Sequence, residues 1–172
     1  MTLRPTDYLG VRRKRRWAGD PNCRFHPHAA AASYTEDQQL QNAPTIAIID
    51  DDESMRCAVK SLVTSFGYDA HTFASAEEFL QSPRLDDTTC LITDLQMPGL
   101  SGVELQKSLL AQERHIPIIF MTAFPEERMR TRAIEAGALG FLSKPFESQT
   151  LINLIDEAIE TSRKKASTIS TH

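Results

Sequence analysis

The chain has 172 residues, of which 41% are hydrophobic and 24% charged, which is ordinary for a globular protein about one domain in size. No run approaches the roughly 18 consecutive apolar residues of a membrane-spanning helix, and no apolar signal core follows the basic N-terminus, so we expect a cytoplasmic protein without membrane insertion. The net charge of −4 is unevenly divided, since residues 1–41 carry seven Lys/Arg against four Asp/Glu and the remainder is acidic.

The segment 1–41 differs in pattern from the rest of the chain. It shows no sustained period of 2 or 3.6 and contains a basic block at 12–16. Such a segment cannot bury enough apolar surface to offset its ordering entropy, so we expect a basic, disordered arm. The basic block could contact phosphates of nucleic acid or an anionic membrane surface. Outside this arm we expect no nucleic-acid partner.

From Ala43 onward, short apolar runs alternate with amphipathic segments. Nearly unbroken apolar runs are typical of strands covered on both faces of a parallel sheet, and they occur at 45–49, 90–93 and 118–121. Weaker strand candidates are 68–73 and 140–142. The alternation therefore predicts five strands.

Helical signals fill the intervals between these strands. Apolar residues recur at helical spacing from Met55 to Phe66, and Gly67 stands where a left-handed residue would end that helix. Capping-box spacing predicts helix starts at Ser75 and Ser101, and a proline followed by two acids predicts another after residue 125. A last helix contains 151–159 and is expected to end near 163–165.

Strand and helix thus alternate five times between about residues 45 and 163. This order with short connections predicts an α/β fold, a doubly wound, mainly parallel five-stranded sheet with five helices. We expect a domain at 42–165 and a short tail at 166–172. Ligands of such sheets bind beyond the C-terminal ends of the strands.

Chemically active side chains stand where four predicted strands end. The first strand runs into the acidic residues 50–53, the third into Asp94, the fourth into Thr122 and the fifth into Lys144. Converging carboxylates repel one another, and a hard divalent cation such as Mg²⁺ keeps them ionised. A carboxylate beside that ion can attack phosphorus and form an acyl phosphate if other groups neutralise the phosphoryl oxygens.

Each of these elements also has an ordinary structural explanation. An acidic run after a strand is commonly a solvated turn that begins a helix, and lysine before proline commonly marks a turn. Thr122 fits the end of a strand, and Asp94 fits the start of the turn at 96–99. Their joint order on successive strands favours the functional interpretation.

Four motifs follow one another along the chain: Ile48-Ile49-Asp50-Asp51-Asp52, Leu91-Ile92-Thr93-Asp94-Leu95-Gln96-Met97-Pro98-Gly99-Leu100-Ser101-Gly102, Ile118-Ile119-Phe120-Met121-Thr122-Ala123 and Gly137-Ala138-Leu139-Gly140-Phe141-Leu142-Ser143-Lys144-Pro145-Phe146. Through these motifs, residues 44–162 resemble the receiver domain of response regulators, the CheY-like superfamily, which implies a flavodoxin-like strand order 2-1-3-4-5. The amino-acid sequence of the second motif is most similar to that of the FixJ-like branch.

The resemblance implies a role for each matching acid. Asp94 corresponds to the aspartate that accepts the phosphoryl group and also binds Mg²⁺. Asp51 is implied as a direct metal ligand, with Asp50 acting partly through water. Gln96 would supply its backbone carbonyl to the metal. Asp52 matches no family role, and we expect it only to add charge at the helix start.

Other positions are implied to act on the phosphoryl group or to report its arrival. Thr122 and Lys144 match the pair that contacts the phosphoryl group, and the Lys144-Pro145 bond resembles one that is cis in the family. Phe141 matches the switch aromatic that turns inward when Thr122 moves, although an aromatic that packs in the core from an edge strand is the ordinary structural explanation. Phe124 departs from the small or polar residues common at its position, and we hypothesise that it shields the phosphoryl group from water.

The family resemblance also implies partners. We expect a sensor histidine kinase or phosphotransfer protein as donor, and a stand-alone receiver without an output domain, because few residues follow the last predicted helix. The surface of the fourth helix, fifth strand and fifth helix would contact a partner or form a homodimer, and it would include arginines at 128, 130 and 132. These arginines could pair across a dimer, or they could form an ordinary solvated face. Such a receiver catalyses only its own phosphorylation and dephosphorylation.

Two other classes of protein remain open. A metal-dependent phosphatase could use Asp94 as nucleophile, although the haloacid-dehalogenase-like hydrolases need a second acid where this chain has Gln96. A degenerate receiver could act as a phosphorylation-independent interaction module, although the complete set of site residues favours a working receiver.

Overall fold

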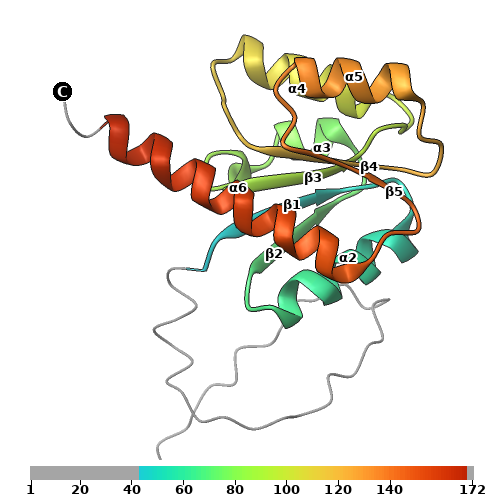
Figure 1. Ribbon diagram of the computed structural model, residues 1–172, viewed down its shortest axis with the longest axis horizontal. Helices are drawn as coiled ribbons and strands as arrows, with labels where there is room; N and C mark the ends of the chain where they lie inside the picture. The colour runs from blue at the N-terminus through green and yellow to red at the C-terminus, as the bar shows by residue number, and fades with distance from the viewer. Residues whose placement is uncertain (1–42, 170–172) are drawn as a thin grey trace, which may run out of the picture.

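The computed structural model describes residues 43–169, with side chains described as far as Lys164. Its centre is a parallel sheet with the strand order β2-β1-β3-β4-β5 (Figure 1). The strands are β1 (Thr45–Ile49), β2 (Asp69–Phe73), β3 (Cys90–Asp94), β4 (Ile118–Thr122) and β5 (Gly140–Ser143). The predicted fold class, strand number and strand order are therefore confirmed.

Helices cover both faces of the sheet. They are α2 (Glu53–Ser65), α3 (Ala76–Leu80), α4 (Gly102–Ala111), α5 (Glu127–Glu135) and α6 (Ser148–Ile169), with a short 3₁₀ turn at Pro83–Leu85. Figure 1 shows α2 and α6 on one face and α3, α4 and α5 on the other. The five predicted helices are thus all present.

Alternate residues of each strand supply two separate cores. In β1, Ile46 and Ile48 pack with residues of α2 and α6, whereas Ala47 and Ile49 pack with residues of α3, α4 and α5. All residues of β3 and β4 are buried. Their near-continuous hydrophobicity follows from this cover on both faces, because no position of either strand meets solvent.

Local sequence fixes where most helices begin and end. Ser101 and Glu104 form a complete capping box at the start of α4, in which the serine hydroxyl accepts from the Glu104 amide and the glutamate accepts from the Ser101 amide. Gly67 and Gly137 follow α2 and α5 with φ of +88° and +90°, values that favour glycine.

The end of the last helix differs from the prediction. Helix α6 continues to Ile169, beyond the stop expected near 163–165. The cluster of basic residues there suits a helix C-terminus, but no glycine or proline follows to end the helix. The predicted arm at 1–41 lies outside the described residues. None of the described helices is long and apolar enough to cross a membrane.

Candidate functional site

The C-terminal ends of four strands bring the predicted side chains to one edge of the sheet. Asp50 directly follows β1, Asp94 ends β3, Thr122 ends β4 and Lys144 directly follows β5. The chain passes from β1 outward to β2 and then back to β3 on the other side, so β1 and β3 flank the point where the strand order reverses. Such a reversal opens the crevice in which doubly wound sheets bind ligands.

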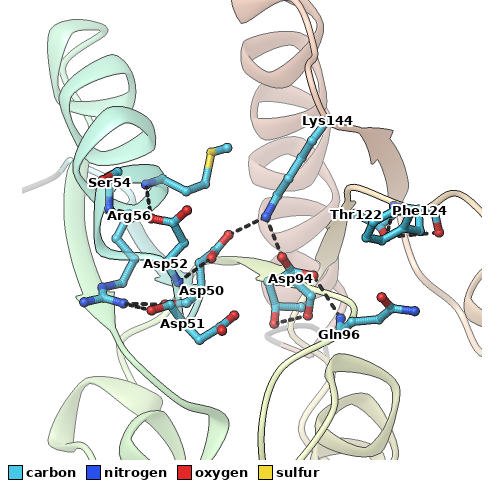
Figure 2. A network of polar contacts seen from close by, with 12 residues as sticks. Asp50, Asp51, Asp52, Ser54, Arg56, Asp94, Gln96, Thr122, Phe124 and Lys144 are labelled. Atoms are coloured by element: carbon cyan, nitrogen blue, oxygen red, sulfur yellow. Dashed lines mark hydrogen bonds and ion pairs between the residues drawn. The ribbon is translucent and has the colours of Figure 1, made fainter.

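Three carboxylates form the acidic part of the site (Figure 2). Asp50, Asp51 and Asp94 each offer an oxygen, and these oxygens all lie within 4.8 Å of one another. Asp50 and Asp94 are buried, whereas Asp51 is exposed. Among the described residues, no group donates a hydrogen bond to the Asp51 carboxylate.

Lys144 joins the two buried acids. Its Nζ lies 2.7 Å from Oδ2 of Asp50 and 2.5 Å from Oδ2 of Asp94. Burial of the ammonium lowers the pKa of Lys144, but the hydrogen bonds to Asp50 and Asp94 outweigh burial, and the net pKa is raised. The Lys144-Pro145 peptide bond is cis, as the family resemblance implies.

The turn after β1 is organised around Asp50 and Asp52. The Asp50 Oδ1 accepts from the Asp52 amide at 2.9 Å, while Oδ2 faces Lys144. Burial raises the pKa of Asp50, and the hydrogen bonds from Lys144 and Asp52 only partly oppose that rise. Asp52 is the N-cap of α2, where it accepts from the amides of Ser54 and Met55. Asp52 was expected only to add charge at the helix start, and the structure shows that its side chain also caps the helix.

The acidic group fits a small divalent cation. Carboxylate oxygens are the ligands that Mg²⁺ prefers, and the exposed Asp51 carboxylate has no competing partner among the described residues. Gln96 lies beside this group, and its backbone amide donates to Oδ1 of Asp94 at 2.9 Å. Figure 2 shows the Gln96 side chain pointing away from the acids. At Gln96, therefore, only the main chain lies next to the acidic group, and the side chain takes no part in it.

Thr122 is buried beside the site and is bonded to its own loop. Its hydroxyl donates to the carbonyl of Phe124 at 3.3 Å and accepts from the Phe124 amide at 3.2 Å. The Phe124 side chain is 70% exposed at this edge. The hydroxyl thus has no hydrogen bond to Asp94 in this arrangement.

Phe141 lies on β5, next to Phe120 of β4 in the sheet register. Its ring is half-buried against the core on the α3, α4 and α5 face. A half-buried position leaves the ring room to move without breaking a hydrogen bond, because phenylalanine has none to break.

Two residues that contact the site loops were not predicted. Arg56 donates from Nη1 to the carbonyls of Asp50 and Asp51, at 2.6 Å and 3.0 Å. Glu77 of α3 accepts from the Leu100 amide at 2.9 Å in the loop after β3. Helix N-termini favour acidic residues, so the basic Arg56 near the start of α2 is a weak sequence signal of a specific contact. Glu77 and Leu100 are 23 positions apart in the chain, so no local sequence pattern predicts their contact.

The fold and the acidic group with its lysine define a receiver-type α/β domain. A family model described as the response regulator receiver domain matches residues 46–156. The chain belongs to this family, the receiver domains of two-component systems.

Similar proteins agree with this assignment. Nodulation protein W of Bradyrhizobium diazoefficiens is 42% identical over 120 residues, which is 70% of this chain and 53% of that protein. Transcriptional regulatory protein FixJ of the same organism is 36% identical over 121 residues, 70% of this chain and 59% of FixJ. The chain thus spans little more than half the length of these curated relatives.

Solved structures show the same architecture. The crystal structure of FixJ-N has a TM-score of 0.63 at 36% identity and covers 69% of this chain and 95% of that one. The response regulator StyR has a TM-score of 0.70 at 40% identity, covering 75% of this chain and 65% of that one.

Proposed function

We propose that this chain is a phosphoacceptor in a two-component phosphorelay, with Asp94 as the residue that takes the phosphoryl group. One observation carries the proposal: the ammonium of Lys144 lies between Asp50 and Asp94, with Asp51 completing a group of carboxylates within 4.8 Å. A nucleophilic carboxylate, a cation and a set of metal-binding acids are what acyl phosphate formation requires.

In the proposed reaction an Asp94 carboxylate oxygen attacks the phosphorus of a phosphohistidine on a histidine kinase or phosphotransfer protein. The new O–P bond forms as the P–N bond breaks, and the imidazole leaves with the electron pair and takes a proton from solvent. Mg²⁺ held by Asp50, Asp51, Asp94 and the Gln96 carbonyl would supply charge that neutralises the phosphoryl oxygens. Lys144 and Thr122 would contact those oxygens, and hydrolysis of the acyl phosphate would return the protein to its starting state.

Thr122 has to break its contacts with Phe124 to serve this role. Its hydroxyl now bonds both polar groups of the Phe124 main chain, so a move toward the phosphoryl group frees the loop between β4 and α5. Phe141 on the neighbouring strand would then turn inward. These two movements would alter the surface formed by α5, β5 and α6, which are the fourth helix, fifth strand and fifth helix of the domain. We call it the α5-β5-α6 surface.

We propose that this α5-β5-α6 surface contacts the regulated partner or a second copy of the chain. Arg128, Arg130 and Arg132 lie on α5, and all three are exposed. Arg130 has only a long ion pair to Glu127, at 3.8 Å, so this charge is available to an acidic partner. The receiver unit would extend over about 42–165.

The test is to incubate the full chain with Mg²⁺ and acetyl phosphate and to measure the intact mass, with Asp94→Asn as the control. A gain of one phosphoryl group that the variant loses supports the proposal. Rapid turnover of varied phosphate esters would instead indicate a hydrolase. No adduct with acetyl phosphate or with a cognate kinase would indicate an interaction module that works without phosphorylation.

A further inference from the structure

Arg56 is the one basic side chain of α2 that reaches back over the acidic turn. It lies in the second turn of the helix, and its amide donates to the carbonyl of Asp52 at 3.0 Å. Side chains near a helix start project toward the N-terminus, which directs Arg56 to the turn between β1 and α2. Figure 2 shows its guanidinium beside the main chain of Asp50 and Asp51.

The partners of this guanidinium are carbonyls, although carboxylates are close by. Nη1 donates to the backbone oxygens of Asp50 and Asp51, at 2.6 Å and 3.0 Å. Arginine in an acidic cluster ordinarily pairs with a carboxylate, since such pairs are stronger. Among the described residues, Arg56 forms no ion pair with a carboxylate within 4.0 Å. Arg56 therefore leaves the carboxylate of Asp51 available to another cation.

Fixing these two carbonyls also fixes the direction in which the Asp51 side chain leaves the main chain. The carbonyls belong to consecutive peptide units on either side of Asp51, so their orientation sets the direction of its Cβ. Asp51 has no side-chain hydrogen bond among the described residues, so its direction toward Asp50 and Asp94 depends on main-chain contacts of this turn, those of Arg56 and the bond from the Asp52 amide to Asp50. The guanidinium charge additionally reduces the repulsion among the three acids.

We propose that Arg56 is a positioning residue of the metal site, which holds the turn after β1 so that Asp51 faces Asp50 and Asp94 before Mg²⁺ binds. The inference rests on the proposed function, because it assigns the acidic group to Mg²⁺. Groups that orient metal ligands without touching the metal typically contribute about 10- to 100-fold to metal affinity. The site is partly open to solvent, so we expect the lower end of that range.

The test is to measure the Mg²⁺ dissociation constant of the full chain by calorimetry, without a phosphodonor. Arg56→Met removes both contacts and should weaken binding about tenfold. Arg56→Lys keeps the charge and can still donate to a carbonyl, so it should recover part of the loss. Lys60→Met is the matched control, because it removes a cation one turn further along α2 where the structure shows no contact with the turn.

Thermal unfolding in a metal chelator separates positioning from folding. A weaker Mg²⁺ affinity in Arg56→Met, with a melting temperature close to wild type, supports the inference. Should Arg56→Met fail to fold, Arg56→Lys is compared with wild type in the same way and should bind Mg²⁺ more weakly while melting normally.

If wild type binds Mg²⁺ normally, either of two results would overturn the role assigned to Arg56 without contradicting the proposed metal site. One is an Arg56→Met affinity within twofold of wild type, and the other is an equal loss in Lys60→Met. Wild-type protein that does not bind Mg²⁺ would instead overturn the proposed metal site, and the Arg56 inference with it.

Discussion

Gly102 is the first residue of α4 and lies directly against the main chain of Asp94. A Cβ at this position would come 2.5 Å from the Asp94 carbonyl oxygen and 3.0 Å from Cε1 of Phe120. Carbon and oxygen ordinarily approach no closer than about 3.3 Å, so Gly102→Ala requires a shift of roughly 0.8 Å. The obstacle is backbone, which cannot rotate away as a side chain can.

The size of the effect follows from two opposing contributions. Overpacking of this kind costs about 1–3 kcal/mol, while alanine in place of glycine in a helix returns up to about 1 kcal/mol. We expect a net loss of about 1–2 kcal/mol, which lowers the melting temperature by roughly 4–8 °C in a domain of this size. Because the strain falls on the Asp94 main chain, phosphorylation by acetyl phosphate should also slow, by about tenfold or more.

Gly67→Ala is the matched control for this prediction. Its Cβ would have no neighbour within 4 Å, but φ is +88°, so the substitution strains the backbone by about 1–2 kcal/mol. Urea unfolding and intact-mass kinetics should show both variants destabilised and only Gly102→Ala slow to phosphorylate. A Gly102→Ala protein as stable and as quickly phosphorylated as wild type would refute this reasoning, and so would equal slowing in Gly67→Ala.

Three further substitutions test other contacts of the site. Lys144→Met leaves the carboxylate of Asp50 buried without its cation and should lower the unfolding free energy by about 2–3 kcal/mol at pH 7, less than a fully buried pair because the site opens to solvent. The pKa of Asp50 is raised on folding, so acid favours the folded variant and its stability deficit should shrink as pH falls toward the ordinary aspartate pKa of about 4. The pKa of Lys144 is also raised on folding, so the deficit should shrink again at pH values above the ordinary lysine pKa of about 10.4, where wild type loses the charge. A deficit that urea unfolding finds independent of pH would contradict this coupling. Phe124→Ala should shorten the lifetime of the phosphorylated protein with less than about 0.5 kcal/mol change in stability, since the ring is 70% exposed; an unchanged lifetime would remove the shielding hypothesis. Glu77→Ala should quicken hydrogen exchange of the Leu100 amide, measured by NMR, and unaltered exchange would show that the 2.9 Å contact does not persist in solution.

The sequence predicted the features that depend on local pattern. Hydrophobic periodicity and runs of apolar residues predicted the five strands. Four side chains were then expected to meet, because each follows or ends a strand and parallel strands end at the same edge of the sheet; they are Asp50, Asp94, Thr122 and Lys144. The pairing of one ammonium with two acids was not predictable in detail. It depends on side-chain conformations that are fixed only when the sheet is assembled.

Contacts between loops escaped prediction for the same reason. Arg56 acts on main-chain oxygens, and carbonyls are present at every position, so no residue type marks its target. Thr122 was expected to face the phosphoryl group, and its present bonds to the Phe124 main chain follow from a local turn geometry that the apolar pattern of β4 does not encode. The length of α6 depends on where helical propensity fades without a stop signal.

The distance along the chain between Asp50 and Lys144 has a consequence for how the protein becomes competent during synthesis. These residues are 94 positions apart, and β5, which carries Lys144 to the site, is the last strand made. A nascent chain that has emerged only as far as β4 possesses every acid of the site but lacks the cation that sits between two of them. The complete site, with its cation between the two buried acids, therefore forms only when β5 joins the sheet, after every other strand has been made.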